Sequence, residues 1–141
     1  MDQNSSFSAG TADVSSAESD ALAGVTVIVC ASCRDETGSD AHPRAGELLA
    51  EDTRRAAAGD IRVRTVECLG NCKRRLSAAI LRDSCWSYVF GDLTATSGAD
   101  LVTGAKLFAT STDGLIPWRG RPDSLKRGLV ARIPPLDMLK D

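Results

Sequence analysis

The sequence predicts an α/β (α+β) fold, with a mixed four-stranded sheet and two main helices in the order βαβββα. Short runs rich in β-branched or aromatic residues recur along the chain. Two segments between them place small and apolar residues at helical spacing. With 141 residues, of which 43% are hydrophobic and 26% charged, the chain fits one domain that buries its core without disulfide bonds.

The first 22 residues are rich in serine, alanine and aspartate. Such a segment cannot bury enough apolar surface to offset its ordering entropy, so we expect a disordered tail over 1–22 and one domain over 23–141. The start of the chain lacks the features of a signal peptide, and no apolar run approaches the ~20 residues that span a bilayer. We therefore expect a cytoplasmic protein that does not bind membranes, in which paired cysteines are ligands or catalytic thiols rather than disulfides.

The first half of the domain has the pattern strand, helix, strand. Residues 25–29 (VTVIV) form an unbroken β-branched run, as expected of a strand covered on both faces. Residues 45–58 show helical spacing that ends before Gly59, and residues 61–66 alternate as a second strand. This order predicts two parallel strands joined by a crossover helix.

The second half has the pattern strand, strand, helix. Residues 76–81 (LSAAIL) and 86–90 (WSYVF) are separated by four residues, which predicts a hairpin. Residues 100–110 can form a helix with its apolar positions facing inward. The C-terminal tail is rich in turn residues. We expect one short helical turn at 124–128, and stacking of an arginine on the tryptophan within 118–121.

Four of the five cysteines form two close pairs, each directly after a predicted strand. The pairs are Cys30-x2-Cys33 and Cys68-x3-Cys72. Because the two strands are expected to be parallel neighbours, both loops should meet at one edge of the sheet. Four converging thiolates suit an iron–sulfur cluster or a structural zinc, since both prefer sulfur to oxygen. Cys85 stands apart in the hairpin turn and is expected to be a passive thiol.

The segment from Cys68 to about Pro117 resembles the thioredoxin-like [2Fe-2S] ferredoxins. In that family a Cys-x3-Cys loop precedes a strand, a turn, a strand of Trp-Tyr type and a helix. These features are matched here by CLGNC, LSAAIL, CWSYVFGDL and the helix around Val102. With the strand–helix unit before it, the resemblance covers about residues 25–117. The whole pattern is more similar still to a family of small bacterial proteins of unknown function that are predicted to bind metal.

The resemblance implies a thioredoxin-like fold and a [2Fe-2S] cluster held by all four paired cysteines. It also implies one-electron transfer to a protein partner, or an accessory role in metal handling, without catalytic residues. Gly70 would allow a tight turn that brings amide groups near the sulfurs. The departure lies in the first loop, because Cys30 and Cys33 are closer together in sequence than the first two ligands of those ferredoxins.

Two alternatives remain from the residues themselves. Structural zinc would use the same four sulfurs, and a thioredoxin-type dithiol would use Cys30 and Cys33, before a helix whose N-terminus stabilises thiolate. The dithiol alternative leaves the other pair unexplained. A Rieske centre needs two histidine ligands, and this chain has only one histidine, His42, so that type of cluster is excluded. We expect His42 to be a surface residue.

The remaining expectations concern partners. A net charge of −2 gives no basis for nucleic-acid binding. Basic residues near the cysteines would either form a solvated face or dock an acidic redox partner; they are Arg34, Lys73, Arg74 and Arg75.

The aromatic residues of the strand at 86–90 should share one face, which we expect to lie in the core; they are Trp86, Tyr88 and Phe90. An exposed face there would instead allow a homodimer.

Overall fold

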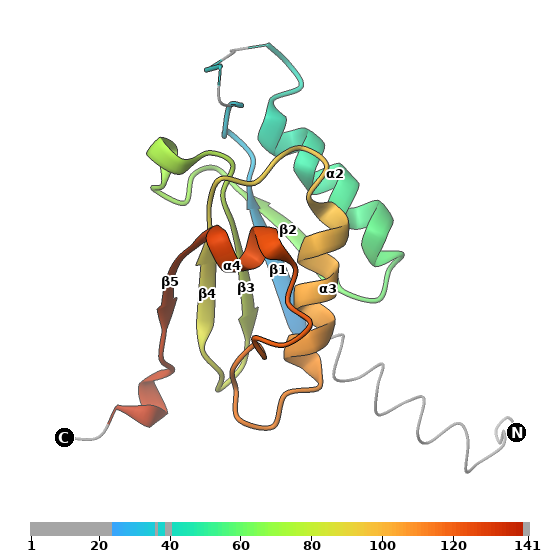
Figure 1. Ribbon diagram of the computed structural model, residues 1–141. Helices are drawn as coiled ribbons and strands as arrows, with labels where there is room; N and C mark the ends of the chain where they lie inside the picture. The colour runs from blue at the N-terminus through green and yellow to red at the C-terminus, as the bar shows by residue number, and fades with distance from the viewer. Residues whose placement is uncertain (1–23, 36, 39–40, 140–141) are drawn as a thin grey trace, which may run out of the picture.

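The apolar runs form a five-stranded mixed sheet in the computed structural model, which describes residues 24–35, 37–38 and 41–139 (Figure 1). In sheet order the strands are β2 (Arg62–Val66), β1 (Val25–Cys30), β3 (Ala78–Arg82), β4 (Ser87–Phe90) and β5 (Leu129–Ile133). β1 and β2 are parallel, and every other neighbouring pair is antiparallel. The predicted parallel unit and hairpin are therefore confirmed, whereas the tail predicted over 1–22 lies outside the described residues.

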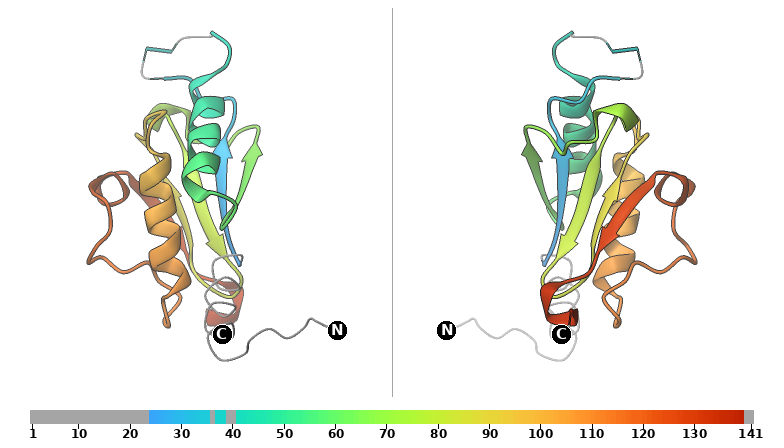
Figure 2. Two further views of the ribbon diagram at one scale, coloured as in Figure 1. Left: turned by 90° about the vertical axis from the view of Figure 1, so that its right-hand side faces the viewer. Right: turned by 90° about the vertical axis from the view of Figure 1, so that its left-hand side faces the viewer.

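Three α-helices lie on one face of the sheet within the described ranges, as the edge-on views of Figure 2 show. They are α2 (Ala45–Ala57), α3 (Gly98–Ala109) and α4 (Asp123–Arg127), accompanied by the 3-10 turns η1 (Cys72–Arg74) and η2 (Leu136–Met138). α2 crosses from β1 to β2, and α3 packs beside it over β1 and β3. Among the described helices, none is long and apolar enough to cross a membrane.

The core lies between this sheet face and the two longer helices. Tyr88 stacks on Phe90 with ring centres 6.0 Å apart, and the edge of Phe108 from α3 meets Tyr88 at 5.7 Å. The expectation that the Trp86–Phe90 face belongs to the core is confirmed for Tyr88 and Phe90, which are buried. β1 lies inside the sheet through its pairing with β2 and β3 and ends at Cys30, so the sheet positions the start of the first cysteine pair.

The predicted count of four strands is wrong, because β5 adds a fifth strand beside β4. β5 is an edge strand whose side chains are mostly exposed, including Arg132 and Ile133. An exposed edge strand has no buried face to impose an apolar alternation on its sequence. Gly128 and Pro134 flank this strand, and these turn-forming residues led to the prediction of turns in place of a strand.

The expectation that β1 is covered on both faces is also wrong. Val25, Val27 and Val29 are fully buried against the helices, whereas Thr26 and Ile28 on the opposite face are half-buried. β1 lies between β2 and β3, so neighbouring strands shield its open face without a second helical layer. The β-branched run reflects the central position of the strand in the sheet.

Candidate metal centre

The two cysteine pairs lie side by side at one edge of the sheet, as the parallel pairing of β1 and β2 requires. Cys30 is the last residue of β1, and the second pair follows β2. Two backbone hydrogen bonds join the loops, from the Ala31 amide to the Val66 carbonyl (2.8 Å) and from the Ser32 amide to the Glu67 carbonyl (3.3 Å). The sulfur of Cys30 also lies 3.7 Å from the Glu67 carbonyl oxygen. The predicted adjacency of the two loops is confirmed.

Three of the four predicted ligands line one cavity of about 310 Å³. Cys30 and Cys33 are buried at its base, and Cys72 reaches it from the exposed second loop. Cys68 does not line the cavity, but its thiol interacts with that of Cys72. The structure thus places the four cysteines as a buried pair and an exposed pair, and all except Cys68 line the cavity.

The donor set fits a soft metal or cluster, because all four groups are thiols and thiolate is the ligand such centres prefer. Within the described residues, no group of three or more His, Cys, Asp or Glu side chains is already close enough to hold a metal ion. The second pair follows β2 and is exposed, whereas the first pair begins at the last residue of β1 and is buried. Closing a four-sulfur site therefore requires Cys68 and Cys72 to approach Cys30 and Cys33.

Gly70 gives the second loop its shape. Its φ of +75° lies in the left-handed region that glycine adopts without strain, and its amide donates to the Cys68 sulfur at 3.2 Å. The expectation that Gly70 permits a tight turn and brings an amide to sulfur is confirmed. Such hydrogen bonds stabilise negative charge on a thiolate.

The thiols of the buried pair differ in acidity. Burial, followed by the side-chain hydrogen bond with Cys30, raises the pKa of Cys33 to about 11. Burial alone would also raise the pKa of Cys30, but hydrogen bonds from the Cys33 thiol, the Leu69 amide and Ser32 outweigh it and lower that pKa. Cys30 is therefore the more readily ionised thiol of the pair.

The exposed pair is coupled to the buried one by charge. A hydrogen bond with Cys68, followed by the charge of Cys68, raises the pKa of Cys72, and the charge of Cys30 adds to this. Arg75 acts in the opposite direction. Ionised sulfurs in the two loops thus repel one another, and a cation or an iron–sulfur core between them would remove that repulsion.

Three arginines surround the cavity, namely Arg34, Arg44 and Arg75. Arg44 donates to the Ser32 carbonyl (3.2 Å), and Arg75 donates to the Asp35 carbonyl (3.2 Å). Of the predicted basic patch, Arg34 and Arg75 thus reach the cavity and Lys73 is exposed. Arg74 instead pairs with Asp92 at 2.8 Å and donates to the Arg127 carbonyl at 3.2 Å, so it joins the loop to the C-terminal segment.

Three contributors were missed from the sequence. Arg44 precedes α2 and was not connected with the first cysteine loop. Ser77, directly before β3, is buried, and its hydroxyl accepts a hydrogen bond from the Asn71 side-chain amide at 3.0 Å, while its carbonyl accepts one from the Cys30 amide at 3.1 Å. Ser77 and Asn71 therefore connect both cysteine loops to the sheet. The Cys-Leu-Gly-Asn-Cys motif itself was the available signal for Asn71.

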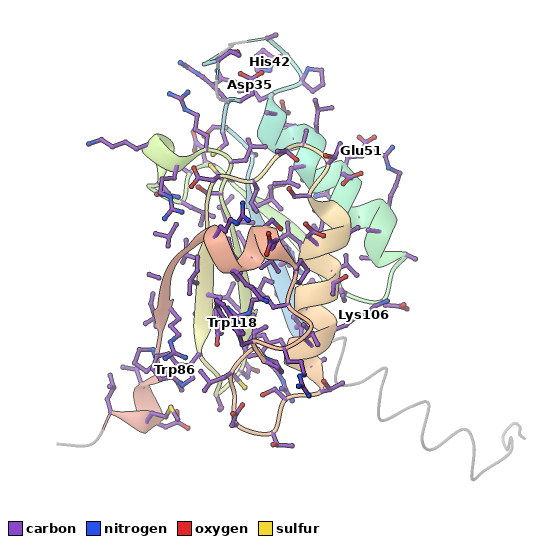
Figure 3. The ribbon with its side chains drawn as sticks, viewed as in Figure 1. Asp35, His42, Glu51, Trp86, Lys106 and Trp118 are labelled. Atoms are coloured by element: carbon purple, nitrogen blue, oxygen red, sulfur yellow. The ribbon has the colours of Figure 1, made fainter. Side chains whose placement is uncertain are left out.

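Cys85 and His42 lie where the sequence predicted. Cys85 is half-buried in the β3–β4 turn beside Gly114 and does not line the cysteine cavity. His42 is exposed at the entry to α2, where its Nδ1 lies 3.7 Å from Glu47, and Figure 3 shows it in the loop above that helix. Neither belongs to the candidate centre.

Comparison with known proteins gives one match. The model of a family described as a protein of unknown function (DUF1636) matches residues 27–135, which include both cysteine pairs, α4 and β5. No curated protein and no solved structure matches the chain.

Proposed function

This chain belongs to the DUF1636 family, and we propose that it is a [2Fe-2S] protein that carries single electrons to a protein partner. All four paired cysteines would hold the cluster. The observation that carries the proposal is the meeting of two cysteine loops at one cavity, to which three of the four sulfurs have access. A bound [2Fe-2S] cluster supplies one-electron redox chemistry.

The surrounding residues are suited to holding a negatively charged thiolate group. The Gly70 amide donates to Cys68, the Leu69 amide donates to Cys30, and Arg75 favours the ionised form of Cys72. Hydrogen bonds to sulfur, burial and nearby positive charge are the means by which a protein sets the reduction potential of such a centre. These contacts support a redox role beyond simple attachment of a metal.

A thioredoxin-like assignment is part of the proposal. It is supported by the strand order β2-β1-β3-β4, in which β2 is parallel and β3 antiparallel to β1. It is also supported by the position of the first cysteine pair, between β1 and the N-terminus of α2. In this assignment β5 is an addition at the sheet edge.

Zinc is the competing occupant of the same four sulfurs. The extensive buried core supports iron–sulfur over structural zinc, because a domain with such a core needs no metal in order to fold. We propose a cytoplasmic electron carrier, not an enzyme, with Arg34, Lys73 and Arg75 facing an acidic partner. Arg74 is left out of this docking patch because Asp92 already neutralises it.

The test is visible absorption of protein purified without air. We expect a reddish-brown protein with bands between about 400 and 600 nm, which Cys30→Ser abolishes because it removes one of four cluster ligands. The matched control is Cys85→Ser, which removes a thiol outside the cavity and should leave the bands unchanged. Colourless wild-type protein, or equal bleaching by both substitutions, would refute the proposal.

A dithiol oxidoreductase is the second candidate, and the geometry of the buried pair supports it. Cys33 accepts a hydrogen bond from the Gly46 amide in the first turn of α2 (3.0 Å) through its carbonyl, so the helix N-terminus lies beside the pair. In this reaction the Cys30 thiolate attacks a partner disulfide and forms a mixed disulfide. The Cys33 thiolate then attacks Cys30 in this mixed disulfide and releases the partner in its reduced, dithiol form. A disulfide between Cys30 and Cys33 remains, and two electrons have passed to the partner.

The two candidates differ in their dependence on the second pair. Reduction of insulin disulfides by dithiothreitol should be accelerated by a dithiol enzyme whether or not Cys68 is present. A cluster protein with Cys68→Ser should lose its visible bands and show no such acceleration. Acceleration that survives Cys68→Ser but not Cys30→Ser would favour the second candidate.

A further inference from the structure

A second cavity lies away from the cysteine loops, between the sheet edge and the segment that follows α3. Its volume is about 500 Å³, within the range of roughly 300–1,000 Å³ typical of small-molecule sites. β4 and β5 form one wall and the segment 113–121 forms the other. Figure 3 shows Trp118 far from Asp35, which marks the cysteine end of the molecule.

Aromatic side chains gather at this cavity. The chain has two tryptophans and one tyrosine, of which one tryptophan and the tyrosine line this cavity. Tyr88 and Trp118 line the cavity, while the ring of Trp86 lies 4.7 Å from the guanidinium of Arg132, another lining residue. Trp118 is 61% exposed, so much of its side chain faces solvent. Exposed aromatic rings of this kind provide a stacking surface for a planar group.

Cations surround the same rings. The Arg121 guanidinium lies 5.6 Å from the centre of Tyr88 and 5.2 Å from that of Trp118, and Lys126 lies 4.9 Å from Trp118. Within the part of the chain that the structure describes, Arg121, Lys126 and Arg132 form no ion pair with a carboxylate. Their positive charge is therefore not neutralised by the fold.

Arg121 is held in place by backbone groups. It is only 8% exposed, its Nε donates to the Pro117 carbonyl at 3.2 Å, and its Nη2 donates to the Ile116 carbonyl. A guanidinium remains charged even where burial lowers its pKa, as burial does here. A buried, charged and positioned arginine without an acidic partner is a suitable group for binding an anion.

One acid, Asp113, also lines the cavity. Its carboxylate accepts the Ser111 hydroxyl at 2.7 Å and the Leu115 amide at 3.0 Å, and these contacts lower its pKa. Asp113 is thus engaged in shaping its own turn. Its negative charge reduces the attraction of the cavity for anions without cancelling the charges of Arg121 and Arg132.

We propose that this cavity binds a small ligand that combines a planar ring with one anionic group, either phosphate or carboxylate. The ring would stack on Trp118, and the anion would be held by Arg121 and Arg132. Bidentate pairing of guanidinium with these oxyanions and stacking on the indole ring would act together. The site is independent of the cysteine centre and of the proposed redox function.

Calorimetric titration of the full chain tests the requirement for both features. The probes are AMP and 1-naphthoate, which carry ring and anion, with adenosine and inorganic phosphate carrying one feature each. We expect AMP or 1-naphthoate to bind at least about tenfold more tightly than adenosine and phosphate. Because AMP and adenosine differ only in the phosphate, the ratio of their affinities measures what that anion contributes. Failure of both to bind, or equal binding of adenosine, would overturn the proposal.

Surface variants assign the binding to this cavity. Arg132→Gln and Trp118→Leu should each weaken binding at least about fivefold, while Asp113→Asn should strengthen it by removing a like charge. Arg119→Gln is the matched control, because Arg119 is exposed in the same segment but does not line the cavity. Equal effects of the substitutions at 119 and 132 would contradict the assignment. Cys30→Ser should leave ligand binding at this cavity unchanged, because Cys30 does not line it. Loss of the visible bands in that variant therefore tests the redox proposal alone.

Discussion

At the scale of single residues, the candidate centre shows how position separates two chemically identical groups. Cys30 and Cys33 are both buried, yet hydrogen bonds lower the pKa of Cys30 while burial and donation to Cys30 raise that of Cys33. The largest lowering contribution to the pKa of Cys30 is the hydrogen bond from the Cys33 thiol, and the Leu69 amide of the second loop, far away in sequence, adds to it. Acidity here depends on the tertiary pairing of the two loops.

This difference predicts the order in which the metal-free protein is alkylated. Iodoacetamide reacts with thiolate, so Cys30 should be modified with a midpoint below the ordinary thiol pKa and Cys33 with a midpoint near pH 11. Mass spectrometry of peptides from samples labelled across a pH series would measure both midpoints. Identical midpoints for the two cysteines would contradict the described hydrogen bonding.

At the scale of elements, the close packing of α2 against the end of β1 positions the first cysteine loop. Gly46 in the first turn of α2 is buried, and a Cβ added there would lie 2.0 Å from the Cys30 carbonyl oxygen. That atom belongs to the backbone and cannot swing away as a side-chain end could. The helix can approach the cysteine loop only because residue 46 has no side chain.

Gly46→Ala should therefore destabilise the protein, although alanine is the better helix former by about 1 kcal/mol. The clash should outweigh this preference and give a net loss of about 1–3 kcal/mol in the free energy of unfolding, measured by urea denaturation. Glu51→Ala, at an exposed position of the same helix, should change stability by less than about 0.5 kcal/mol. A stabilised Gly46→Ala variant would show that the two elements are less closely packed than described.

Elements whose sequence carries an apolar pattern could be predicted, including the edge strand β2 with its Val63 and Val66, and the element without such a pattern could not. The valine run of β1, the leucines and phenylalanine of α3 and the aromatic strand β4 carry patterns imposed by burial. β5 was missed because its exposed side chains carry no such pattern. The adjacency of the cysteine loops followed from the strand–helix–strand order, whereas Arg44 and Ser77 were missed because only tertiary packing brings them to the loops.

At the scale of the whole molecule, polar contacts add to the β4–β5 pairing in tying the C-terminal segment, residues 111–139, to the sheet. The hydroxyl of Tyr88 accepts the Ile116 amide at 2.9 Å inside the protein, and Arg121 lies over the same tyrosine ring. Arg74 joins the second cysteine loop to the carbonyl of Arg127. The C-terminal segment is thus part of the same folded unit as the cysteine centre.

Tyr88→Phe tests this connection. It removes the acceptor for a buried amide while keeping the ring, so we expect a loss of about 1–3 kcal/mol in the free energy of unfolding. Ser87→Ala, at the neighbouring half-buried position of β4, should have an effect within about 0.5 kcal/mol. Thermal or urea denaturation would measure both, and equal stability of Tyr88→Phe and wild type would contradict the anchoring role of this contact.

The central claim is that two cysteine loops close around one iron–sulfur cluster. It is tested most directly by measuring iron, acid-labile sulfide and zinc in protein purified without air. We predict about two iron and two sulfide per chain, with negligible zinc, because a [2Fe-2S] cluster bound by four thiolates has that composition. About one zinc per chain without sulfide, or no metal at all, would contradict the claim.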